Sequence, residues 1–166
     1  MKEYIAQIAN MAHIKRYSVI PVIHKESIAE HSFFVSAIVI KLHQDYIFDL
    51  GTALAMATIH DMTESYTDDI TILTKRRFPK IAEAVEEAEY EIASEIFPSH
   101  IKSIWYEYKK GESVEAKIVK LADTIQVMQY AYNEMRMGNC GYMVSVHTNA
   151  EIRFKKLEEQ LNELKR

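Results

Sequence analysis

The chain has 166 residues, of which 48% are apolar and 27% are charged, and its formal net charge is −4. This length and balance are typical of one globular domain, and the lack of a basic excess disfavours duplex nucleic acid and anionic membranes as partners. No apolar run approaches the roughly 18 residues that span a bilayer, and the amphipathic N-terminal segment does not resemble a signal peptide. The single cysteine, Cys140, excludes an internal disulfide framework. We therefore predict one cytoplasmic domain over residues 1–166.

Apolar residues recur at helical spacing almost throughout, and only 4 glycines and 3 prolines interrupt them. We therefore predict an all-α fold, a bundle of six to eight helices. The first predicted helix carries Ile5, Ile8 and Ala12 on one stripe, and Pro21 ends the segment that follows it.

The second predicted helix begins with a capping box, because Ser27 is followed three residues later by Glu30. We expect this helix to point Phe34, Ile38 and Leu42 inward. A third helix is predicted from about residue 49 through residue 63.

Four more helices are predicted after a loop. The first covers FPKIAEAVEEAEYEIASEIF, with Pro79 suited to its first turn, and the second covers SHIKSIWYEYKK and stops at Gly111. The third covers SVEAKIVKLADTIQVMQYAYNEMRMG and stops at Gly138, and the fourth is HTNAEIRFKKLEEQLNELKR. The fourth has a heptad-like apolar stripe of Phe154, Leu157, Leu161 and Leu164. The apolar segment CGYMVSVH is expected to be a loop or a helix start rather than a strand.

The segment HDMTESYTDDI, residues 60–70, places a histidine and several acidic and hydroxyl side chains directly after the apolar run GTALAMATI. A buried carboxylate is costly unless it is paired or holds a metal. On a helix, His60 and Asp61 lie about 100° apart and can reach one shared point. Glu64 lies four residues after His60 and joins the same face. The segment is therefore either a solvated helix end or a site.

Two residues on other predicted helices have matching chemistry: His31 in the first turn after the capping box, and Asp123 inside the apolar run IVKLADTIQVM. Two imidazoles and two carboxylates form a mixed nitrogen and oxygen set for one divalent ion such as Mn, Co, Ni, Fe, Zn or Mg. Four protein ligands on an octahedral ion leave positions for water, as a catalytic site requires. A solvated His31, an Asp123 paired with Lys120, and a helical bundle without a metal remain open.

These candidates occur in a distinctive order: His31, then the dipeptide His60–Asp61 at the end of a helix, then Asp123 inside a later helix. In this order the chain resembles the HD-domain phosphohydrolases. The segments ESIAEHSFFVS and HDMTESYTDDI resemble ENVSEHS and HDxxEVxTGD of the bacterial 5′-deoxynucleotidase subgroup. The pair Arg16–Tyr17, a basic residue followed by an aromatic one, also fits that subgroup.

The resemblance implies an HD-type helical domain with one bound divalent metal. The implied metal ligands are His31, His60, Asp61 and Asp123. Glu64 would act near the attacking water as a general base or proton carrier, and Asp69 would orient the water or the sugar.

The resemblance also implies substrate contacts. Arg16 would hold the phosphate, for which a guanidinium is suited, and Tyr17 would pack on the sugar. Two residues depart from the subgroup: Asp68 stands where the subgroup has glycine, and Tyr17 stands where it has tryptophan. Both departures are expected to lie near the nucleoside.

Together these features predict a metal-dependent phosphohydrolase for small deoxynucleotides, most simply a 5′-nucleotidase acting on deoxynucleoside 5′-monophosphates. The basic segment TKRRFPK is either a solvated helix boundary or sends Lys75, Arg76 or Arg77 toward the pocket. A longer phosphate chain would use these cations, so a deoxynucleoside triphosphate triphosphohydrolase is the alternative. A metal-binding regulatory module without turnover also remains open. The resemblance suggests a homodimer, with the last helix and CGYMVSV at the interface, although both could instead close the core of the monomer.

Overall fold

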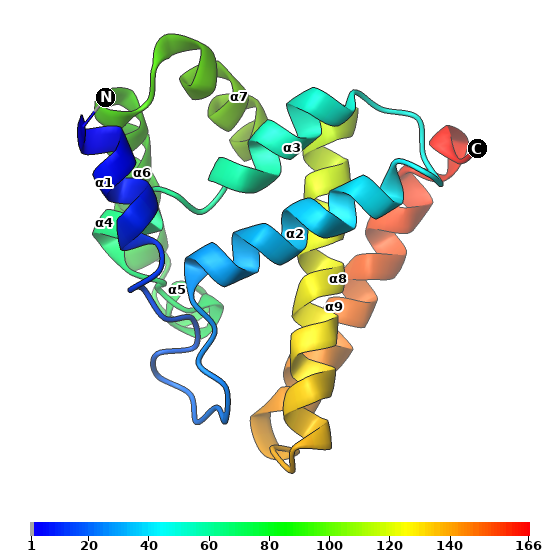
Figure 1. The fold of residues 1–166 in the computed structure, drawn as a ribbon. Coiled ribbons are helices and arrows are strands. Elements are labelled where there is room, and N and C mark those ends of the chain that lie inside the picture. Colours follow the sequence, from blue (N-terminus) through cyan, green and yellow to red (C-terminus); the bar gives the residue numbers. More distant parts are fainter. Residues whose placement is uncertain (1) are drawn as a thin grey trace.

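The computed structural model describes residues 2–166, and within them every regular element is a helix (Figure 1). The elements are α1 (Lys2–Asn10), α2 (Ile28–Leu42), α3 (Leu50–Ile59), α4 (Glu64–Thr67), α5 (Ile72–Arg77), α6 (Pro79–Ile96), α7 (Ser99–Lys110), α8 (Val114–Arg136), α9 (Gly141–Gln160) and the short 3₁₀ helix η1 (Asn162–Leu164). The predicted all-α fold is confirmed. The predicted six to eight helices correspond to the seven that have nine or more residues; α4 and α5 are short additions.

The long helix α8 is the centre of the fold. It packs along α9 and against α2 and α3, as Figure 1 shows for the yellow and orange helices. The core between them contains Val35, Val39, Leu42, Ala53, Met56, Ala57, Ile118, Val119, Leu121 and Ala122. Full burial of each large apolar side chain contributes about 1.5–3 kcal/mol, and the alanines let the helix backbones approach closely. This core fixes the relative positions of α2, α3 and α8.

A second apolar cluster joins α1, α6 and α7 to the end of α3. Its largest member is Trp105, which is fully buried with Ile28, Ile59, Met62 and Phe97 around it. Helices α2 and α3 contribute to both clusters, and a third, smaller cluster around Tyr130, Ala131 and Met143 joins α8 to α9. Among the described residues, none of the helices combines the length and apolar character needed to cross a membrane.

The capping box at the start of α2 is present as predicted. The Ser27 hydroxyl accepts a hydrogen bond from the Glu30 backbone N–H at 3.2 Å, and Glu30 Oε2 accepts one from the Ser27 N–H at 2.7 Å. Such a cap contributes about 1 kcal/mol. It also fixes the first turn of α2, in which His31 lies fully buried.

The inward face of α2 differs from the prediction by one residue. Phe34 is 51% exposed, whereas Val35 is fully buried. The apolar run SFFVSAIVI offers two overlapping faces, and the buried one is the stripe that continues from His31 through Val35 and Val39 to Leu42. The expectation was therefore right for Leu42 and wrong for Phe34.

The apolar stripe of α1 lies on the solvent side. Ile5 and Ile8 are 57% and 47% exposed. The buried side chain of this helix is Gln7, which accepts a hydrogen bond from the Ser65 hydroxyl at 3.0 Å, and Tyr4 packs edge-on against Phe97. The Tyr66 hydroxyl also donates to Glu3 Oε1 at 3.3 Å, so polar contacts with α4 and the aromatic contact of Tyr4 attach helix α1.

Most helix ends follow the predicted signals. Pro79 is the first residue of α6, and Gly111 and Gly138 adopt positive φ angles of 71° and 103° after α7 and α8. Helix α3 ends at Ile59, before the predicted residue 63, and the chain continues through turns into α4.

The C-terminal segment closes the core of the chain itself. CGYMVSVH forms the start of α9, one of the two expected outcomes. In the heptad-like stripe Leu161 is fully buried, and Phe154, Leu157 and Leu164 pack against the central core. The stripe therefore packs within the chain, which is the alternative considered for it.

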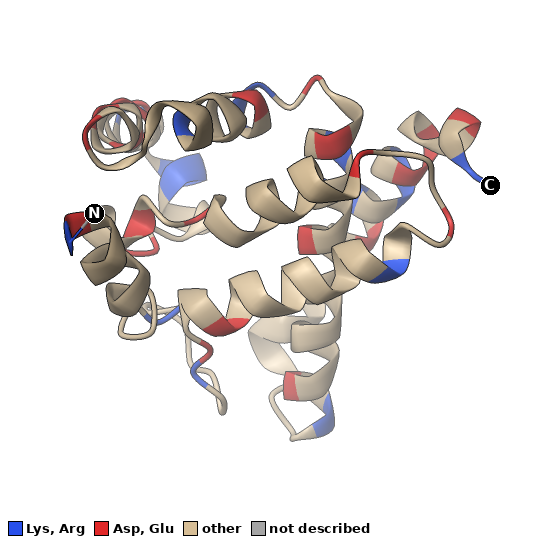
Figure 2. Cartoon of the chain, turned by 45° about the horizontal axis from the view of Figure 1, so that its top comes forward, with Lys and Arg blue, Asp and Glu red and all other residues tan. Residues whose placement is uncertain are grey.

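Acidic and basic residues are interspersed over the helices, as Figure 2 shows. This mixture agrees with the small net charge of −4.

Candidate active site

The four side chains predicted as metal ligands come together where α2, the end of α3 and the middle of α8 meet. We refer to His31, His60, Asp61 and Asp123 as the ligand cluster. One donor atom from each of His31, His60 and Asp61 lies within 4.8 Å of the others. His60 Nε2 is 3.1 Å from Asp61 Oδ2 and 3.2 Å from His31 Nε2. Asp123 completes the ligand cluster through its contact with His31: His31 Nε2 is 3.4 Å from Asp123 Oδ1.

The backbone fixes the orientation of His60. Its Nδ1 lies 2.8 Å from the Ala57 carbonyl oxygen, which can only accept, so Nδ1 carries a proton and Nε2 is the nitrogen that presents a lone pair when the imidazole is neutral. The Trp105 indole donates to the His60 carbonyl oxygen at 3.3 Å and anchors the same residue from the core. This tautomer is the one in which His60 Nε2 can bind a metal.

A buried polar network holds His31. Gln126 Oε1 is 2.8 Å from His31 Nδ1, and Gln126 Nε2 donates to Glu26 Oε1 at 2.6 Å, which fixes the orientation of the amide. Arg16 donates to Glu26 Oε2 at 3.2 Å and also contacts His31 Nδ1. Glu26 is 3% exposed, so this ion pair is shielded from water.

The ligand cluster fits a divalent cation. The His60 lone pair and the oxygens of Asp61 and Asp123 converge beside His31 Nε2. Acceptor atoms this close in a buried place require a positive group among them. Imidazole nitrogens and carboxylate oxygens together suit a borderline or hard divalent ion.

The carboxylates of the cluster are held ionised. Burial alone would raise the pKa of Asp61, but its contacts with His60 and His31, when these imidazoles are protonated, and the charge of Arg16 outweigh burial and hold that pKa well below its usual range. Burial likewise opposes ionisation of Asp123, and the hydrogen bond from His31 and the charge of Arg153 lower its pKa. A metal ligand must be deprotonated, and both groups meet this condition.

Glu64 and Asp69, the two predicted catalytic residues, lie on the wall of a cavity beside the cluster. Burial raises the pKa of Glu64 well above its usual range, and the negative charges of Asp61 and Asp69 raise it further. Asp69 Oδ2 accepts a hydrogen bond from the Tyr17 backbone N–H at 3.0 Å. Asp69 therefore ties the Arg16–Tyr17 segment to the cavity wall.

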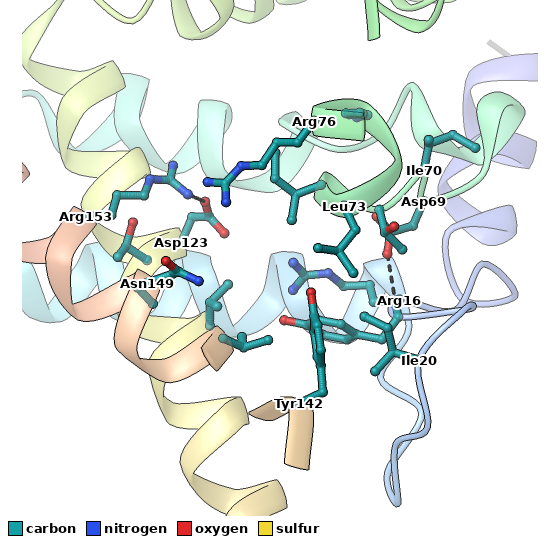
Figure 3. A pocket seen from close by; sticks show the side chains of 18 of the residues that line it. Arg16, Ile20, Asp69, Ile70, Leu73, Arg76, Asp123, Tyr142, Asn149 and Arg153 are labelled. Atoms are coloured by element: carbon teal, nitrogen blue, oxygen red, sulfur yellow. Dashed lines mark hydrogen bonds and ion pairs between the residues drawn. The ribbon is translucent and has the colours of Figure 1, made fainter. Parts of the chain in front are cut away.

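The cavity has a volume of about 410 Å³ and opens above the ligand cluster (Figure 3). It falls in the size range of small-molecule sites. Its charged and polar walls include Arg16, Tyr17, Asp61, Glu64, Asp69, Lys75, Arg76, Asp123, Tyr142, Asn149 and Arg153. All of the residues predicted as substrate contacts thus face the same cavity.

The predicted substrate contacts also have partners within the chain. Tyr17 stacks on Tyr130 with ring centroids 4.9 Å apart, and burial raises the pKa of Tyr17 to about 12. Tyr17 has a positive φ of 60°, a strained conformation for an aromatic residue. Lys75 Nζ is 4.0 Å from Glu89 Oε1, so its charge is shared with an acid of α6.

Comparison with known proteins identifies the fold. The model of the family described as "HD domain" matches residues 8–165. The chain belongs to the HD domain family. A 5′-deoxynucleotidase from Pasteurella multocida is 28% identical over an alignment that covers 84% of this chain and 77% of that protein. A 5′-deoxynucleotidase from Xenopus laevis is 27% identical over an alignment that covers 68% of this chain and 59% of that protein.

The fold of this HD domain also occurs in solved structures. The PH0347 protein from Pyrococcus horikoshii matches with a TM-score of 0.83 and 27% identity, over 98% of this chain and 95% of that one.

Sequence reasoning missed three residues around the ligand cluster of this HD domain. Arg153 on α9 pairs with Asp123 Oδ2 at 3.1 Å, in place of the Lys120 considered above. Nothing in the alternating charges of α9 marks Arg153. Gln126 could have been found, because it lies one turn after Asp123 on α8. Glu26 lies directly before the capping box and gives no further signal.

The structure places Asp68 away from the cavity wall and does not support the expectation that it lies near the nucleoside. Its side chain is exposed and does not line the cavity. Its backbone has φ 63° and ψ 166°, a conformation that glycine adopts readily and other residues rarely. The turn between α4 and α5 therefore favours glycine at this position for a backbone reason alone.

Proposed function

We propose that this chain is a single-domain, metal-dependent phosphohydrolase, and specifically a 5′-nucleotidase that hydrolyses deoxynucleoside 5′-monophosphates to deoxynucleoside and phosphate. The observation that supports the chemistry is the convergence of the ligand cluster at a cavity that is also lined by Glu64 and by several cations. The similarity to two 5′-deoxynucleotidases supports the choice of substrate.

In this proposal His31, His60, Asp61 and Asp123 hold one divalent ion, of the series Mn, Co, Ni, Fe, Zn and Mg. Such an ion would supply an acidified water and polarise a phosphoryl oxygen. Glu64 accepts the proton of the attacking water, a role for which a carboxyl with a raised pKa is suited. Asp69 keeps the Arg16–Tyr17 segment against the cavity through the Tyr17 N–H.

A second candidate is a triphosphohydrolase that acts on deoxynucleoside triphosphates. The observation that favours it is that Lys75 and Arg76 of α5 line the same cavity as the ligand cluster. A triphosphate needs more cations than a monophosphate does, because its charge is larger.

The test is a panel of deoxynucleoside monophosphates, deoxynucleoside triphosphates and ribonucleotides, assayed with Mn²⁺ or Co²⁺ on protein whose metal content is measured. The leading proposal expects phosphate release from deoxynucleoside monophosphates, and release of triphosphate instead would favour the second candidate. Glu64→Gln should abolish turnover while the metal stays bound. A metal-loaded protein that is inactive on every nucleotide would overturn both candidates and favour a regulatory module.

A further inference from the structure

The cations that line the cavity differ in how far their charge is already compensated. Arg16 is paired with the buried Glu26 at 3.2 Å, and its side chain is only 14% exposed. Lys75 is shared with Glu89, which Lys109 also contacts. Two further guanidinium groups line the cavity and are more exposed: that of Arg76, and that of Arg153, which pairs with Asp123.

Arg153 is held at the edge of the ligand cluster. One of its nitrogens is 3.1 Å from Asp123 Oδ2, while the other oxygen of Asp123 faces His31. A guanidinium has five N–H donors in a planar fork, so this contact leaves donors available. The side chain is 48% exposed, and Figure 3 shows it pointing into the cavity from α9.

Arg76 reaches the cavity from the opposite wall. It belongs to α5, and Figure 3 shows its guanidinium extending toward the region of Asp123 and Arg153. Within residues 2–166 no carboxylate lies within 4.0 Å of it. The two guanidinium groups repel each other, and an anion bound between them would offset this repulsion.

We propose that Arg76 and Arg153 form an anion subsite that binds a phosphate dianion beside the ligand cluster. Planar guanidinium groups suit phosphate oxygens, since each can donate two parallel hydrogen bonds. In this arrangement Arg16 is a positioning residue, because its contacts go to Glu26, Gln126 and His31. That the anion is the phosphate of a nucleotide rests on the proposed function, whereas binding of free orthophosphate does not.

The test is a calorimetric titration of inorganic phosphate into the full-length protein with Mn²⁺ bound. Arg76→Gln and Arg153→Gln should each raise the Kd for orthophosphate about tenfold, the size expected for losing a charge-assisted hydrogen bond. Arg77→Gln is the matched control: it removes the same charge from the next residue of α5, which is exposed and does not line the cavity. It should change the Kd less than about twofold.

Metal content is measured for every variant, since Arg153 touches Asp123. Arg153→Lys keeps a cation beside Asp123 without the planar fork, and we expect it to recover part of the affinity that Arg153→Gln loses. Equal Kd values for Arg76→Gln and Arg77→Gln would overturn the subsite, as would a loss confined to variants that also lose metal.

Nucleotide kinetics form the second arm. If the substrate phosphate uses this subsite, Arg76→Gln raises the KM for the deoxynucleoside monophosphate more than it lowers kcat. Weakened orthophosphate binding in a protein that hydrolyses no nucleotide would support the subsite and overturn the proposed function. If the enzyme hydrolyses nucleotides and the variants still bind orthophosphate normally, the proposed function is supported and the subsite is overturned.

Discussion

The ligand cluster and the basic side of the cavity are built in different ways. His31 and His60 are 0% and 4% exposed, and the core helices α2, α3 and α8 hold the cluster. Lys75, Arg76 and Arg153, which we call the basic rim, come from α5 and α9 and are partly or largely exposed. Rigid packing suits metal ligands, whose geometry must be preorganised. Exposed cations instead suit an anion that enters from water, so we propose that the cluster carries the chemistry and the rim captures the substrate.

The largest expected effect is the loss of the metal from the cluster. His60→Ala should abolish metal binding and lower kcat by more than about 10³-fold, because the remaining donors no longer surround the ion. Elemental analysis and phosphate release measure the two effects. The control is His100→Ala, which removes an exposed imidazole in the first turn of α7. Full metal occupancy in His60→Ala would break the assignment of the cluster.

Arg16 forms a buried ion pair with Glu26, whereas Arg153 forms a more exposed ion pair with Asp123. Arg16→Gln leaves Glu26, only 3% exposed, without its cation. Removing one partner of a buried pair costs about 3–5 kcal/mol. Arg153→Gln removes a half-exposed partner, and an exposed pair contributes at most about 1 kcal/mol. Urea unfolding of both variants should therefore give a much larger loss for Arg16→Gln, and equal losses would remove the distinction between the buried network that holds His31 and the exposed basic rim.

The support of His31 should appear in metal affinity. Gln126→Leu removes the acceptor at His31 Nδ1 and the donor to Glu26. Partners of this kind typically contribute about 10–100-fold to metal affinity, so the Kd for Mn²⁺ should rise by that factor in a competition titration. Gln129→Leu, three residues later on the exposed face of α8, is the matched control and should leave the Kd unchanged.

The ligand cluster and the basic rim also differ in how far they could be predicted from the sequence. The ligand cluster follows from short-range signals, the dipeptide His60–Asp61 and the capping box that places His31 in a first turn. The basic rim depends on how α9 packs along α8, a long-range result that brings Arg153 to Asp123 across 30 residues of sequence. Charged residues on an amphipathic helix usually face water, so no local pattern distinguishes Arg153.

The fold shows a similar limit. The all-α class and most helix ends follow from periodicity, proline and glycine, which act locally. The one-residue error between Phe34 and Val35 arises because consecutive apolar residues in α2 permit two faces, and only tertiary packing selects one. Helices α4 and α5 have 4 and 6 residues, too few for a periodic pattern.

The smallest expected effect concerns Asp68 in the turn between α4 and α5, which leads from the ligand cluster to the basic rim. Asp68 has φ 63° and ψ 166°, and such strain costs roughly 1–3 kcal/mol in a residue with a Cβ atom. Its side chain accepts a hydrogen bond from the Asp69 N–H at 2.9 Å, which offsets part of that cost. Asp68→Gly should therefore stabilise the protein by about 1 kcal/mol, a rise in Tm of about 2–4 °C.

Asp68→Ala separates the two contributions, because it keeps the Cβ atom and loses the hydrogen bond. It should be no more stable than the original protein, whereas Asp68→Gly should be more stable in the same thermal scan. Since Asp68 is exposed outside the cavity, both variants should keep the KM for the nucleotide within about twofold. A large change in KM with unchanged Tm would mean that this residue acts on the substrate after all, and the boundary of the basic rim would then have to include the turn between α4 and α5.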